Sequence, residues 1–144
     1  MNLRDTAGIL AMISALDSRK VYGEIDAQAW HAVIGDLRFD DCREAVIAHY
    51  RESSYSITPA DVRSKVLAVR KARIGERVAP LPPVSPEDVK AYQEWQQAWY
   101  RGVGDGLTDD EAEKVADHIL GVARQSLPQA PRTVEYGSLA RRVE

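Results

Sequence analysis

The residues with the most reactive side chains are three histidines, His31, His49 and His118, and one cysteine, Cys42. The histidines lie in separate stretches of the chain, and none has the spacing of a Cys/His zinc site. His49 and Cys42 also fall on the apolar stripe of one predicted helix, where a hydrogen-bonded histidine and a small buried thiol are common. The sequence therefore predicts no catalytic centre, no metal site and no cofactor.

Two other motifs suggest chemistry but have simpler explanations. The segment 102–106, Gly-Val-Gly-Asp-Gly, lacks the lysine and the preceding strand of a phosphate-binding loop, so a turn between helices is expected. The acidic runs 40–41 and 109–111 fall at predicted helix N-termini, where the helix dipole alone favours carboxylates. Neither motif predicts an active site.

Large aromatic side chains gather near the start of the second half of the chain. Tyr92, Trp95 and Trp99 follow the i, i+3, i+7 spacing that puts them on one helical face, and Tyr100 is adjacent. Trp and Tyr dominate the binding energy of many protein interfaces, so these four residues are a candidate partner-binding face. The alternative is that they form the core between two C-terminal helices.

A second candidate surface is basic. Residues 61–79 contain six Lys and Arg residues against two acidic residues, although the whole chain has a net charge of −3. Side chains of this kind can contact phosphates or an acidic partner. The candidate residues are Arg63, Lys65, Arg70, Lys71 and Arg73. The alternative is an ordinary solvated helix face.

The elements that carry these residues are all predicted to be helices. Helical periods predict helices over 3–19 and 26–36, the second capped by Asp26, and a third helix that Asp40 caps. Thr58, Pro59 and Asp61 then form a strong start signal for a fourth, because they supply the N-cap hydroxyl, the N1 proline and the N3 carboxylate.

Four prolines between residues 79 and 86 disfavour helix and predict a semi-rigid spacer. Ser85 and Pro86 predict a helix over 86–101, and the capping box that begins at Thr108 predicts another over 109–126. The fold class is therefore all-α. We expect a compact four-helix N-terminal bundle at 1–78, a proline-rich linker at 79–86, a C-terminal helical hairpin at 87–126 and a flexible tail at 127–144.

The compartment is predicted from what the sequence lacks. One cysteine cannot form an internal disulfide, and no apolar stretch reaches the length of a signal peptide or a membrane span. A cytoplasmic protein is expected.

Residues 3–73 resemble the N-terminal domain of the phage and prophage replicative DNA helicase loader/inhibitor proteins. The resemblance rests on the first helix with Ile9, Leu10 and Ile13, on Trp30 followed by 34–37 (Ile-Gly-Asp-Leu), on Phe39 with Asp40, and on the segments 45–50 and 57–63 with the intervening Ser53. Two departures are the replacement of a proline by residues 18–20 (Ser-Arg-Lys) and the helical pattern after Pro86.

The resemblance implies a non-enzymatic adaptor in phage DNA replication that acts in the cytoplasm of a bacterial host. Its expected partners are the replicative DNA helicase and a phage origin-binding or replisome-organising protein, and both loading and inhibition stay open. The aromatic face 92–100 is the expected helicase contact. One alternative is a small DNA-binding regulator that uses the basic helix 61–77, and another is a phage inhibitor of a different host protein.

Overall fold

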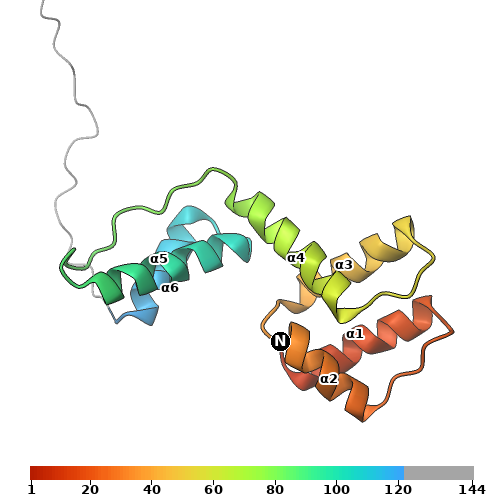
Figure 1. Cartoon of the computed structure of the whole chain (residues 1–144). Coiled ribbons are helices and arrows are strands. Elements are labelled where there is room, and N and C mark those ends of the chain that lie inside the picture. The colour runs from red at the N-terminus through yellow and green to blue at the C-terminus, as the bar shows by residue number, and fades with distance from the viewer. Residues whose placement is uncertain (122–144) are drawn as a thin grey trace, which may run out of the picture.

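The computed structural model describes residues 1–121, which form six helices and no strand within that range (Figure 1). The helices are α1 (Leu3–Leu16), α2 (Glu24–Ile34), α3 (Phe39–Glu52), α4 (Pro59–Ile74), α5 (Val89–Gly104) and α6 (Asp109–Ile119). The all-helical fold class is confirmed for this part of the chain. The predicted tail at 127–144 and the predicted end of the last helix at 122–126 lie outside the described residues.

Helices α1 to α4 share one apolar core and are called the N-terminal lobe below. Helix α1 packs on α2 and α3, and α4 packs on the same two helices. The core takes one stripe from each helix together with two residues from the connections between them. Its members are Ile9, Leu10, Ile13, Ala27, Trp30, Ile34, Leu37, Cys42, Ala45, Val46, Ile57, Val62 and Val66.

The start of α4 confirms the predicted capping signal. The Thr58 hydroxyl accepts the Asp61 N–H at 3.3 Å, and the Asp61 carboxylate accepts the Thr58 N–H at 2.9 Å. In α2 the expectation that Asp26 is the N-cap is wrong, because the helix begins after Gly23 and Asp26 lies one turn in. Its carboxylate accepts the Gly23 N–H at 2.7 Å, which is the N3 half of a capping box.

Helix α3 begins at Phe39, one residue before Asp40, the predicted cap. Helix α5 begins and ends three residues later than the predicted 86–101. Residues 85–88 form a turn, and the Asp88 carboxylate accepts the Ala91 N–H at 3.1 Å, so Asp88 is the N-cap. At the other end α5 continues to Gly104. Gly102 therefore lies inside the helix and not at its end. A Cβ at this position would lie 3.1 Å from the Cβ of Ala112, so glycine here lets α6 pack closely against α5.

Helices α5 and α6 form the C-terminal lobe around a second core. Its buried residues are Trp95, Ala98, Trp99, Val103, Ala112 and Ala116. Ile74 at the end of α4 and Ala79 in the connecting segment also pack against this core. Helix α4 therefore reaches from one lobe to the other, as Figure 1 shows, and the two lobes contact each other in addition to being joined by the proline-rich segment.

Candidate functional site

The aromatic residues of α5 lie mainly inside the C-terminal lobe. Trp95 and Trp99 are 0% and 1% exposed, and the Trp95 Nε1–H donates to Asp117 Oδ1 at 2.8 Å. The ring of Tyr100 meets Trp99 edge-on at 5.0 Å, and its hydroxyl accepts the Ala79 N–H at 3.3 Å. These contacts show that both tryptophans pack in the core between the two C-terminal helices, which was the alternative to a partner-binding face. Their rings could reach a partner only if α5 and α6 separated.

Tyr92, the fourth aromatic candidate, is half-buried near the start of α5. It lines a shallow surface groove together with Leu81 and Val89, two exposed apolar residues. Two of the four predicted partner-binding residues therefore line surface grooves, Tyr92 this one and Tyr100 a groove between α4 and α5.

Most of the basic candidates on α4 are already paired with carboxylates of the same chain. The ion pairs join Arg63 to Asp36, Lys65 to Glu52, Arg70 to Asp105 and Arg73 to Asp41, at 2.6 to 3.1 Å. Among the described residues, Lys71 alone of the five candidates has no such partner. A paired cation must give up its carboxylate before it can bind a phosphate, so the basic helix is less suited to coating DNA than its composition suggests.

The Arg63 and Arg70 ion pairs differ in geometry. Arg63 donates two parallel hydrogen bonds to the Asp36 carboxylate, at 2.6 and 3.0 Å, and these bonds hold the Asp36 pKa below its usual value. Arg70 differs, because its Nη2 lies 3.1 Å from Asp105 Oδ1 while that oxygen is buried and receives no well-aligned hydrogen bond. The Arg70 contact is therefore chiefly Coulombic.

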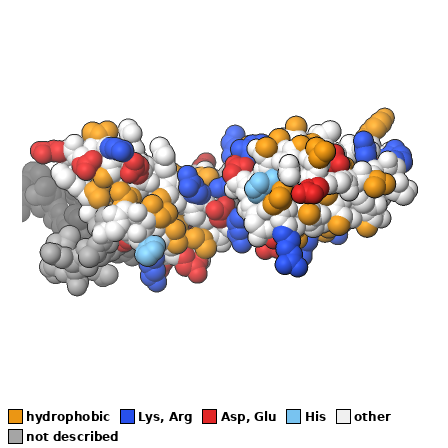
Figure 2. Space-filling view, turned by 90° about the horizontal axis from the view of Figure 1, so that it is seen from below, with side chains coloured by type: hydrophobic (Ala, Val, Ile, Leu, Met, Phe, Trp, Pro, Cys, Tyr) orange, Lys and Arg blue, Asp and Glu red, His pale blue; other side chains and the backbone are white. Residues whose placement is uncertain are grey.

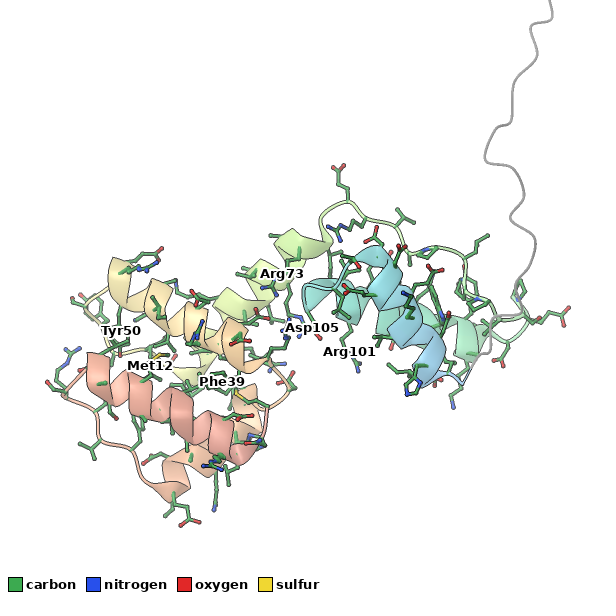
Figure 3. The ribbon with its side chains drawn as sticks, turned by 180° about the vertical axis from the view of Figure 1, so that it is seen from behind. Met12, Phe39, Tyr50, Arg73, Arg101 and Asp105 are labelled. Carbon is green, nitrogen blue, oxygen red and sulfur yellow. The ribbon has the colours of Figure 1, made fainter. Side chains whose placement is uncertain are left out.

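Arg73 is the centre of the joint between the lobes (Figure 3). Its guanidinium donates to both carboxylate oxygens of Asp41 on α3, at 2.7 and 3.0 Å, and to the Gly104 carbonyl at 3.0 Å. The Asp41 carboxylate is only 7% exposed, and its hydrogen bonds raise the Arg73 pKa. A cation at the C-terminal end of α5 also meets the negative end of the helix dipole. Arg38 adds to the joint by donating to the Asp105 carbonyl.

Charged side chains of both signs gather where the two lobes meet, at the narrow waist seen in Figure 2. The acidic half of this joint, Asp41 and Asp105, was not predicted from the sequence, because Asp41 has the position of a helix-dipole carboxylate and Asp105 lies in a segment typical of a turn. Each partner lies more than 30 residues away along the chain. No local pattern could have revealed these pairs.

An apolar groove runs between α1 and the start of α2. It has a volume of about 650 Å³, and its lining includes the small side chains Ala7, Ala11 and Ala27. Val21 in the loop before α2 and Ile25 in the first turn of α2 lie next to the lining residues and are 91% and 82% exposed. Exposed apolar side chains beside an apolar groove are typical of a protein-binding surface. No pattern in the sequence predicts this groove, because alanine is common on both buried and exposed faces of a helix.

Cys42, His31 and His49 are each buried or in contact with neighbouring polar groups of the chain. Cys42 is fully buried, and this burial raises the pKa of its thiol to about 11, which keeps it protonated and poorly nucleophilic. His31 Nδ1 lies 3.0 Å from the Thr6 hydroxyl, and His49 Nε2 lies 2.9 Å from the Tyr55 carbonyl oxygen. Within residues 1–121, no three His, Cys, Asp or Glu side chains are grouped as a metal site would require.

The buried carboxylate of Asp17 is a further feature that the sequence did not single out. It accepts hydrogen bonds from the Arg19 guanidinium at 2.7 and 3.0 Å and from the Ser56 hydroxyl at 2.7 Å. Arg19 also donates to the Ser54 carbonyl at 2.8 Å. These bonds tie the end of α1 to the segment before α4, so Asp17 has a structural role.

None of the helices in residues 1–121 has the length and apolar content needed to cross a membrane. Comparison of the chain with protein-family models, with curated proteins and with solved structures finds no match.

Proposed function

We propose that this chain is a non-enzymatic adaptor that binds a replicative DNA helicase, as loader or inhibitor, during phage DNA replication. The observation that carries a binding role is the apolar groove between α1 and α2 with its exposed neighbours. The resemblance of residues 3–73 to the loader/inhibitor proteins is what specifies the helicase. In this proposal 1–78 is the loader-like bundle, 79–86 the linker and 87–126 the C-terminal hairpin.

The α1/α2 groove fits an amphipathic helix of the partner. Ala7 and Ala11 lie one turn apart on α1, and their small side chains let a second helix approach closely. Val21 and Ile25 would then lose their exposure to water on binding. Burying a side chain of this size contributes about 1.5–3 kcal/mol, so these two side chains are the expected energetic anchors.

The ion pairs of α4 favour this proposal over the DNA-binding regulator. With four of the five basic candidates paired to carboxylates, little uncompensated charge is left to attract a duplex. An inhibitor of another host protein would use the same groove, so that alternative differs in the partner and not in the surface. The proposed site of action is the cytoplasm of the bacterial host, with a phage origin-binding or replisome-organising protein as a second partner.

The test is co-purification of the full chain with the replicative helicase of the host. An Ala11→Arg variant places a long cation in the groove and should remove most of the bound helicase. Ala15→Arg is the matched control, because residue 15 is exposed on the same helix and lies outside the groove lining. If the wild-type chain retains no helicase, the helicase proposal is rejected. If both variants retain it equally, the groove assignment is wrong.

A further inference from the structure

A second groove lies between α4 and α5, with a volume of about 680 Å³. Helix α4 contributes Leu67, Lys71 and Ile74 to it, which share one face because they are spaced by three or four residues. Helix α5 contributes Tyr100 and Arg101. Both walls of the groove therefore combine apolar or aromatic side chains with a cation, and the cations come from both lobes.

The charges around this groove do not cancel. Its two carboxylates are both committed to internal ion pairs, Asp36 with Arg63 and Asp105 with Arg70. Lys71 and Arg101 are exposed and form no ion pair within the described residues. Two positive charges are thus left uncompensated beside an apolar surface. Arg101 stands one turn before Asp105 on α5, near the end of that helix that meets the N-terminal lobe (Figure 3).

We propose that the α4/α5 groove binds a nucleoside phosphate, with Lys71 and Arg101 contacting the phosphate and the neighbouring apolar side chains receiving the base. A phosphate fits because it accepts hydrogen bonds from a guanidinium fork and an ammonium at the same time. The planar base fits because Leu67, Ile74 and Tyr100 offer apolar area next to those cations. The nucleotide is either free or one unit of a single strand.

This site is independent of the α1/α2 groove and of the proposed helicase partner. It draws one cation from each lobe, and the Arg70–Asp105 pair at its edge already links α4 to α5. A bound phosphate would therefore add a bridge between the lobes. Because the ligand binds the native state, it should raise the unfolding temperature of the whole chain.

The test is titration of the full chain with ATP, inorganic phosphate, a short oligothymidylate and polyglutamate, followed by tryptophan fluorescence and by thermal unfolding. Trp99 reports on the site because its ring lies 5.0 Å from that of Tyr100. Lys71→Gln and Arg101→Gln should each weaken nucleotide binding about tenfold, the loss expected for one charge-assisted hydrogen bond. Both residues are exposed and unpaired, so the variants should melt like the wild type in the absence of ligand.

The matched control is Lys20→Gln, which removes the same charge from an exposed site outside the groove and should leave binding unchanged. Binding of ATP that depends on Lys71 and Arg101 supports a free nucleotide, and such binding of the oligothymidylate alone supports a strand. The proposal is overturned if neither binds, if the two variants bind like the wild type, or if polyglutamate binds as tightly as the nucleotides.

Discussion

Replacing Arg73 by alanine should destabilise the whole chain and loosen the contact between its lobes. The substitution removes three hydrogen bonds of 2.7 to 3.0 Å, two to Asp41 and one to the Gly104 carbonyl. It also leaves the Asp41 carboxylate, 7% exposed, without its cation. Breaking a fully buried pair costs about 3–5 kcal/mol, and the 33% exposure of the Arg73 side chain reduces the expected loss to about 2–3 kcal/mol.

The assay is equilibrium unfolding by denaturant and by heat, with hydrogen exchange as the local measurement. A loss of this size lowers the melting temperature by about 6–10 °C for a chain of 144 residues. Amide exchange should accelerate in α5 and α6 more than in α1, because the lost bonds join the C-terminal lobe to the rest. In an Arg73→Ala, Asp41→Ala double variant the orphaned charge is gone, so stability should partly recover.

Arg43→Ala is the matched control, since Arg43 on α3 pairs with the adjacent Glu44 and both side chains are exposed, at 48% and 63%. An exposed pair of this kind contributes about 0–1 kcal/mol. If Arg73→Ala is no more destabilising than Arg43→Ala, or if exchange in α5 and α6 does not change, the Arg73 joint does not hold the lobes together.

Three further substitutions test the packing of the lobes. Trp95→Ala should cost about 3–5 kcal/mol in chemical unfolding, because Trp95 is fully buried, and a smaller loss would mean that its pocket collapses or is not closed. Gly102→Val should cost about 1–3 kcal/mol by crowding Ala112, and unchanged stability would refute the close approach of α5 and α6. The Arg19 hydrogen bonds hold the Asp17 pKa well below its usual range, so their stabilisation should be present at neutral pH and lost as pH falls below about 4. Asp17→Asn should flatten the acid limb of the stability-against-pH curve, and an unchanged limb would contradict this role.

The sequence predicted the local features of this fold well because their causes are local. Thr58, Pro59 and Asp61 lie within four residues, and their capping hydrogen bonds need no distant partner. The start of α5 was missed because Ser85 and Asp88 are competing N-caps three residues apart, and the Asp88 carboxylate is the one that accepts a helical N–H.

The functional surfaces were harder to predict because they depend on which helix covers which. Helical spacing correctly grouped Trp95 with Trp99, but the same spacing describes a buried stripe and an exposed one. The basic side chains of α4 posed the same difficulty, since composition counts Arg73 as a free cation while the fold brings Asp41 to it from 32 positions away. In both cases the burial or pairing of a side chain depends on tertiary contacts, which helical spacing and composition do not describe.

Helix α4 changes how the two lobes can act on a partner. Val62 and Val66 near its start are buried in the first core, while Ile74 at its end packs on the second. If only a proline-rich tether joined the two lobes, each could orient freely on a partner. The gain in affinity from binding with both would then depend on the length of the tether. With a continuous helix and the Arg73 joint between them, the α1/α2 and α4/α5 grooves are instead held in one mutual orientation. A single partner can then use both lobes at once only if its own surfaces match that orientation, so the arrangement favours geometric specificity over reach.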